Sequence, residues 1–202
     1  MKRTLILRER LAEAGLGAYF RPRDIKPLGV SFRALLRLVA EGEVEKVGFG
    51  QYRLTSLKFD EFETVAMVSS AIPDGIVCLL TALRVHEIGT QSPHEVWMAI
   101  SRKARKPVRL PAKVRIVRFS GAMLTYGVIS RPMMGVSVRI TSPARTIVDC
   151  FRYRNKVGID VALEAMRDGI RSKKVTRDDI SRTAEVCRAR TVVGPYLEAL
   201  SA

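Results

Sequence analysis

The sequence has little of what disulfide-linked or metal-binding proteins need. Its 202 residues include three cysteines and two histidines. Cys78, Cys150 and Cys187 lie far apart in apolar stretches without a CxxC spacing, which argues against a disulfide framework and against zinc. His86 and His94 have no second ligand at a suitable spacing. We therefore expect buried, reduced thiols and no metal site.

Long apolar runs are also missing. No stretch approaches the roughly 20 apolar residues that a membrane helix requires. The run Leu5–Leu7 near the N-terminus is too short for the core of a signal peptide. Hydrophobic residues nevertheless make up 47% of the chain, which is enough to bury a core. The sequence predicts a folded cytoplasmic protein without a membrane-spanning segment.

Acidic residues are scarce relative to basic ones. The chain has 35 Lys and Arg against 20 Asp and Glu, which gives a formal net charge of +15. Between Glu95 and Asp149 there is no acidic residue, whereas eleven Lys and Arg occur there. So basic a chain favours a polyanionic partner, of which nucleic acid is the commonest. A soluble protein that is merely basic is the alternative.

The N-terminal residues have the order of elements of a winged helix-turn-helix. Apolar periodicity predicts a helix over Thr4–Ala14 and a short helix that begins with Pro22. A third helix follows Ser31, a favourable N-cap residue, and ends before Gly42. Two strand-like runs then form a glycine-flanked hairpin: Val44–Val47 and Gln51–Leu54. We predict a DNA-binding winged helix-turn-helix over residues 1–58.

The third helix supplies the candidate base contacts. Its apolar residues Phe32, Leu35, Leu36 and Val39 share one face and are expected to pack inward. Arginine matches the acceptor pair on guanine bidentately, so the expected major-groove residues are Ser31, Arg33 and Arg37. The residues expected to contact phosphate or to form the wing are Arg21, Arg23, Lys46, Phe49, Gln51 and Arg53. An ordinary solvated side chain is the alternative for each arginine, and some winged helices bind protein instead.

Residues 59–202 are predicted to form a mixed α/β C-terminal domain, which places the chain in the α+β class. Helices are expected over Asp60–Ser70, Ile76–Ile88, Ser142–Phe151, Ile159–Arg171, Thr176–Cys187 and Pro195–Leu200. Strands are expected over the β-branched runs Glu95–Ile100, Val114–Phe119 and Val136–Thr141.

Two further groups of charged residues leave alternatives open. A proline-bearing loop holds five basic residues: Arg102, Lys103, Arg105, Lys106 and Arg109. This loop fits phosphate contacts beyond the wing, an acidic partner protein, or a plain solvated loop. The second group comprises Arg145, Asp149, Arg152, Arg154 and Lys156. Its first three residues have the spacing of an ion-pair chain along a helix, and a structural role is favoured over a partner-binding face.

The residues form no recognisable catalytic pattern. No Ser or Cys nucleophile has a paired base, and the glycines at residues 48–50 lie in a hairpin, not in a strand-to-helix phosphate loop. A restriction-type nuclease needs an acidic pair with a lysine, and no Glu-x-Lys or Asp-x-Lys strand follows Asp74. We expect no enzymatic activity and no cofactor. The alternative is a DNA-binding protein whose C-terminal domain resembles a restriction nuclease, degenerate or active.

Several segments resemble one known family. In the N-terminal domain they are Asp24-Ile25, Gly29-Val30-Ser31, Leu35-x-Arg37-Leu38-Val39, Glu41-Gly42 and Gly48-Phe49-Gly50-Gln51-Tyr52. In the C-terminal domain they are Cys78–His86, Ser142–Cys150 and Phe151–Gly158. Together they resemble the AbiEi-type antitoxins of abortive-infection AbiE systems, which are classed as type IV toxin–antitoxin systems. Phe49 departs from the basic residue expected at the wing tip.

The resemblance implies a transcriptional repressor that binds inverted repeats in its own promoter through the winged helix. It also implies that the C-terminal domain counteracts a nucleotidyltransferase-like toxin. The implied partners are therefore double-stranded promoter DNA and, functionally, that toxin.

Overall fold

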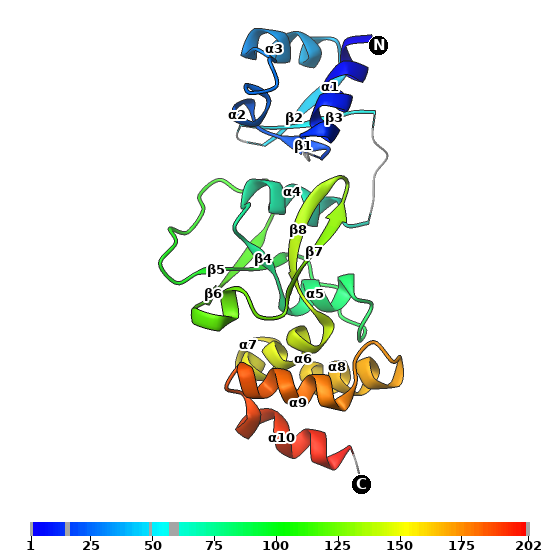
Figure 1. The fold of residues 1–202 in the computed structure, drawn as a ribbon, viewed down its shortest axis with the longest axis vertical. Helices are drawn as coiled ribbons and strands as arrows, with labels where there is room; N and C mark the ends of the chain where they lie inside the picture. Colours follow the sequence, from blue (N-terminus) through cyan, green and yellow to red (C-terminus); the bar gives the residue numbers. More distant parts are fainter. Residues whose placement is uncertain (1, 15–16, 49, 57–60, 201–202) are drawn as a thin grey trace. The chain divides into compact units, whose positions relative to one another are not determined.

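A computed structural model describes residues 2–14, 17–48, 50–56 and 61–200 (Figure 1). It contains helices and two separate sheets, which confirms the α+β class. The chain forms two compact units whose segments alternate along the sequence. The N-terminal unit comprises Met1–Pro73, Lys106–Lys113 and Ser130–Val138, and the C-terminal unit comprises Asp74–Arg105, Val114–Ile129 and Arg139–Ala202. The domain boundary between residues 58 and 59 that the sequence predicts leaves these two later segments out of the N-terminal domain. In the structure, contacts between residues distant in the chain bring them into the N-terminal unit.

The N-terminal unit has the winged-helix order of elements. Its helices are α1 Lys2–Glu13, α2 Pro22–Ile25, α3 Phe32–Ala40 and α4 Glu63–Ala71. Its strands are β1 Tyr19–Phe20, β2 Val44–Gly48 and β3 Gln51–Leu54. The strands form an antiparallel sheet in the order β1-β3-β2, in which Phe20 pairs with Tyr52 and Val44 with Leu54.

Local sequence explains where these helices begin. Ser31 precedes α3 in an extended conformation, and its Oγ accepts a hydrogen bond from the backbone N–H of Ala34 at 3.2 Å, as an N-cap residue does. Pro22 is the first residue of α2, where its missing N–H costs no helical hydrogen bond. Buried side chains from the helices and strands form one apolar core: Leu7, Leu11, Phe20, Ile25, Leu35, Leu38, Val44, Tyr52 and Leu54.

Helix α4 and the segment around residue 134 are joined to this winged helix by polar contacts. The Tyr19 hydroxyl donates to the Glu63 carboxylate of α4 at 2.5 Å. The backbone N–H of Ala18 donates to the carbonyl of Met134 at 2.8 Å. Beside that bond the backbones of Gly17 and Gly135 approach so closely that a Cβ on Gly17 would lie 2.3 Å from the carbonyl carbon of Gly135. Glycine at position 17 is therefore needed for this close approach.

The C-terminal unit combines most of a five-stranded sheet with a group of helices. The strands of the sheet are β4 Ile76–Val77, β5 Val96–Ser101, β6 Val114–Phe119, β7 Val128–Met133 and β8 Val136–Thr141, in the order β6-β5-β4-β8-β7. Strand β4 runs antiparallel to β5 and parallel to β8, and β5 runs parallel to β6. The helices are α5 Leu79–Val85, α6 Pro143–Arg152, α7 Arg154–Val157, α8 Ile159–Arg171, α9 Arg177–Val186 and α10 Arg190–Ala199, with a 3₁₀ turn η1 at Gly121–Leu124.

Two parts of this unit differ from the prediction. The run Ile76–Ile88, expected to be one helix, begins as strand β4 and turns at Leu79, where φ is 51°, into the shorter α5. A continuous apolar run fits a buried strand as well as a buried helix, and periodicity does not separate the two. Strand β7 was missed because it contains Pro132 and mostly exposed residues, a composition that suits an edge strand.

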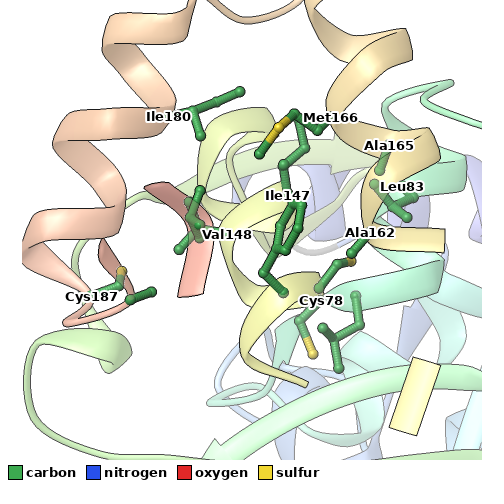
Figure 2. Packing of buried hydrophobic residues seen from close by; sticks show 14 of the residues in the cluster. Cys78, Leu83, Ile147, Val148, Ala162, Ala165, Met166, Ile180 and Cys187 are labelled. Atoms are coloured by element: carbon green, nitrogen blue, oxygen red, sulfur yellow. The ribbon is translucent and has the colours of Figure 1, made fainter. Parts of the chain in front are cut away.

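The core of the C-terminal unit lies around α6, which packs against α5, α8 and α9. Figure 2 shows Ile147 of α6 facing Ala162 and Met166 of α8, and Val148 on the side of Ile180. All three cysteines of the chain are buried and form no disulfide, as the sequence predicts. No helix within the described ranges is long and apolar enough to cross a membrane.

Candidate nucleic-acid interface

Helix α3 presents a mixed basic and apolar face to solvent. Leu35 and Leu38 are its buried residues, whereas Arg33 and Arg37 are exposed on the opposite side. Neither arginine forms an ion pair or a side-chain hydrogen bond with any residue that the structure describes. Their charges are therefore available to a partner. Ser31 is also exposed, but its Oγ caps the helix.

The inward stripe predicted for α3 is wrong at two positions. Phe32 is 54% exposed and Leu36 is 49% exposed, whereas Leu35 is fully buried and Val39 half-buried. The prediction placed the buried face on Phe32 and Leu36, but this helix meets the core through Leu35 and Leu38. Leu38 lies three residues after Leu35, and this pair turns positions 32, 33, 36 and 37 away from the core.

The wing supplies fewer contacts than the sequence predicts. Lys46 on β2 is exposed, and Phe49 lies outside the described residues. Gln51 is buried, and its side-chain amide donates to the carbonyl of Met67 at 2.8 Å. The expectation that Gln51 reaches the DNA is therefore corrected, because its amide stabilises the packing of α4 against the sheet.

Arg53 is also corrected from a phosphate contact to a structural residue. Its side chain is buried and pairs with Glu45 at 2.7 Å and with Glu63 at 2.9 Å. Burial by itself would lower the pKa of Arg53, but the hydrogen bond and charge of Glu45, followed by the charge of Glu63, raise it above its ordinary value. A guanidinium engaged by two carboxylates inside the unit does not reach a phosphate.

The start of α2 places two arginines beside the sheet. Arg21 is partly buried, and its Nη2 donates to the carbonyl of Ala71 at the end of α4. Burial, and then repulsion from Arg23, lower the pKa of Arg21 below its ordinary value. The side chain of Arg23 is 66% exposed and lies 3.5 Å from Asp24. Arg23 is thus the more accessible of the two.

The second half of the basic loop belongs to the same surface. Pro111 lies against the wing at Gly48, where an added Cβ would be 3.2 Å from the proline Cβ. A groove of about 520 Å³ is lined by the α2 start, the wing and this loop, and it includes Arg21, Arg23 and Arg109. Lys106 and Arg109 are exposed in the N-terminal unit. The fold therefore extends the positive surface of the winged helix with residues distant in sequence.

The first half of the basic loop belongs to the C-terminal unit. Arg102, Lys103 and Arg105 are exposed there. Arg118 shapes this part of the loop, since its Nη1 donates to the carbonyls of Ser101 at 2.8 Å and Ala104 at 2.5 Å. The five basic residues expected to act as one patch are thus divided between the two units.

The charged cluster on α6 has a structural core. Arg145 and Asp149 are fully buried and pair through Nε and Oδ2 at 2.9 Å. The other guanidinium nitrogens of Arg145 donate to the carbonyls of Tyr126 and Met123. Burial raises the pKa of the Asp149 carboxyl to about 6, because the loss of hydration outweighs the attraction of Arg145. The structural interpretation of this pair fits the geometry.

The remaining members of the cluster lie nearer the surface. Arg152 donates to the carbonyl of Cys187 and does not extend the ion-pair chain to Asp149. Arg154 donates to the carbonyl of Phe151 at 3.1 Å, and the Lys156 ammonium lies 5.6 Å from the centre of the Tyr153 ring. These contacts fix the turn after α6.

Histidine and acidic residues form no group of three or more potential metal ligands in the described part of the chain. His86 Nε2 lies 2.7 Å from the carbonyl of Thr141, so this ring joins α5 to the end of β8. Asp74, the start of the nuclease hypothesis, accepts a hydrogen bond from Arg139 only through its backbone carbonyl.

Part of the chain is similar to a known protein family. Residues 9–55, which span the winged helix, match the family described as transcriptional regulator, AbiEi antitoxin. The winged-helix domain is thus similar to that of AbiEi antitoxins. The described role of that family is transcriptional regulation, and the likeness to it lies in the winged helix. No curated protein sequence matches the chain significantly.

A solved structure shares the architecture of this protein. The crystal structure of the RV2827C protein from Mycobacterium tuberculosis is similar with a TM-score of 0.58 and 12% sequence identity. The similarity covers 92% of this chain and 72% of that chain. At this identity the match shows a shared fold that extends well beyond the winged helix.

The sequence did not predict two parts of the surface of this protein. Phe32 and Leu36 would have been predicted as exposed if the buried face of the helix had been centred on Leu35 and Leu38. The local sequence does not predict that residues 106–113 pack beside the wing, because this packing brings Pro111 close to Gly48, which lies far from it in the chain.

Proposed function

We propose that this AbiEi-type regulator represses its own operon by binding inverted repeats in the promoter. The observation that carries the proposal is the pair Arg33 and Arg37, exposed on α3 and without an intramolecular partner among the described residues. A helix of this kind lies in the major groove with its N-terminal residues against base edges. An unpaired guanidinium there can donate two parallel hydrogen bonds to guanine.

The surrounding positive residues fit phosphate contacts. Lys46 on the wing, Arg23 at the start of α2, and Lys106 and Arg109 on the adjoining loop are exposed in one unit. Arg21 borders the same groove as Arg23 and Arg109. Contacts of this type set the register of the protein on the duplex and make affinity depend on salt.

The C-terminal domain, in this proposal, counteracts a nucleotidyltransferase-like toxin encoded beside the regulator. The support is the AbiEi match together with a large, separately packed C-terminal core that the DNA contacts do not use. The exposed residues Arg102, Lys103 and Arg105 are in this unit and offer a positive surface for such a function.

The DNA proposal is tested by selecting duplexes from a random pool and by mobility shift with the chain's own upstream DNA. The double variant Arg33→Ala, Arg37→Ala should lose about 1–3 kcal/mol of base discrimination for each arginine. Lys46→Ala should lower the slope of log affinity against log salt by about one. The matched control is Arg171→Ala, Arg182→Ala, which removes two exposed charges from α8 and α9. Equal effects of both double variants would reject a base-contacting role for α3.

The toxin proposal is tested separately in cells. The neighbouring nucleotidyltransferase-like reading frame is expressed with either the wild-type regulator or Arg33→Ala, Arg37→Ala. Growth should be restored by both, because the substitutions lie in the winged helix, while repression of a promoter fusion should be lost only with the variant. Growth restored by neither protein would contradict the antitoxin role.

A further inference from the structure

Two large apolar side chains lie on the solvent-exposed side of α3. Phe32 is the first residue of the helix and is 54% exposed, and Leu36 follows one turn later at 49% exposure. Residues four apart share a helix face, so the two side chains are neighbours. Arg33 and Arg37 are the next residues around the helix, and both are exposed. The exposed face of α3 is thus an apolar pair beside a basic pair.

Charge decides what kind of partner fits this face. A second copy of the chain, packed about a two-fold axis, would bring the arginines of both copies together, because such an interface uses the same patch twice. Like charges without counter-ions oppose that arrangement. The major groove presents the opposite charge together with one apolar group, the 5-methyl of thymine. DNA therefore complements both pairs of residues.

We infer that Phe32 and Leu36 contact thymine methyl groups and so determine which base pairs lie beside the guanines contacted by Arg33 and Arg37. The inference rests on the proposed DNA-binding function and adds a preference for thymine at particular positions of the site. Phe32 occupies the N-terminal turn, the part of such a helix that reaches base edges. About half of each side chain is exposed, so contact with a methyl group buries apolar surface on both partners.

The effect of one methyl group has a definite size. Transfer of one methyl group from water into an apolar contact contributes about 0.8 kcal/mol, which corresponds to about a fourfold change in affinity. Deoxyuridine in place of thymidine removes this methyl and leaves the hydrogen-bonding groups of the base unchanged. The substitution therefore isolates the proposed contact.

The probe is the duplex that the full-length protein selects from a random pool. Each thymidine is replaced in turn by deoxyuridine, and affinity is measured by mobility shift. Wild-type protein should lose about fourfold at one or two positions in each half-site. Phe32→Ala or Leu36→Ala should abolish the loss at its own thymidine, whereas Arg33→Ala should retain it. Ile159→Ala, a control that shortens a side chain 37% exposed on α8, should behave as wild type.

The outcomes separate this inference from the proposed function. Absence of any selected duplex would reject the proposed DNA-binding function itself. Specific binding that is unaffected by deoxyuridine at every position would reject the thymine contacts alone, and this result needs no variant protein. A change of oligomeric state in Phe32→Ala, measured by sedimentation at an unchanged melting temperature, would also reject them and assign the face to a protein partner.

Discussion

Replacement of Arg145 by methionine tests the buried centre of the C-terminal domain. The guanidinium of Arg145 is fully buried, pairs with Asp149 at 2.9 Å and donates to two backbone carbonyls. It also lies 5.1 Å from the centre of the Phe119 ring. Among the described residues Asp149 Oδ1 accepts no hydrogen bond. The ion pair with Arg145 is therefore the main interaction that offsets the lost hydration of this buried carboxylate.

The expected loss is large relative to the stability of a domain. Removal of one partner from a buried ion pair costs about 3–5 kcal/mol, because the other charge stays buried without compensation. Domains have total stabilities of about 5–15 kcal/mol. For a domain of this size the loss corresponds to a decrease in melting temperature of about 10–20 °C. Arg145→Met combined with Asp149→Leu removes both charges and should recover most of that loss.

The pH dependence gives a sharper test of the same pair. The folded-state pKa of Asp149 is raised to about 6 by burial, above the value of about 3.9 in an unfolded chain. The folded protein therefore binds the additional proton, and its stability decreases as the pH rises from about 4 to about 6. In Arg145→Met the attraction to the guanidinium is lost, so the pKa of Asp149 rises further and the decrease continues beyond pH 6.

Thermal and urea unfolding, followed by circular dichroism at pH 5 and pH 8, measure this difference. The destabilisation of Arg145→Met relative to wild type should be larger at pH 8 than at pH 5. The double variant should show no contribution from this site at either pH. A single variant that loses less than about 1 kcal/mol, or a loss equal at both pH values, would refute the assignment of Arg145 and Asp149 as a coupled buried pair.

Two further predictions concern the N-terminal unit. Gly17→Ala should lower its stability by about 1–3 kcal/mol, because the new Cβ would overlap the backbone at Gly135. The control is Gly194→Ala on α10 of the C-terminal unit, where the added Cβ meets no atom within 4 Å and the change should be neutral or stabilising in the same melting experiment. Arg53→Met should lower stability by about 1–3 kcal/mol but leave the salt slope of DNA binding unchanged, unlike Lys46→Ala. A reduced slope for Arg53→Met would show that this buried side chain reaches phosphate after all.

Most element positions in the winged helix follow from short-range chemistry. Ser31 as a cap and Pro22 at a first helical position place two helix starts correctly, because both effects act within one turn. The errors arise where the outcome depends on distant residues. Ile76 enters a strand because Ala99 pairs with it, and nothing in the local run distinguishes that strand from a helix.

The sequence by itself determined the winged-helix order, the excess of positive charge and the resemblance of the winged helix to AbiEi antitoxins, since periodicity, composition and local motifs carry these. Only the tertiary structure decided which of the cations are available to a partner. Arg33 and Arg53 have the same chemistry, but one is exposed and the other is held by two carboxylates. The same holds for Phe32 and Leu35, because burial of a side chain depends on which other elements cover it, and that information lies in contacts between residues far apart in the chain.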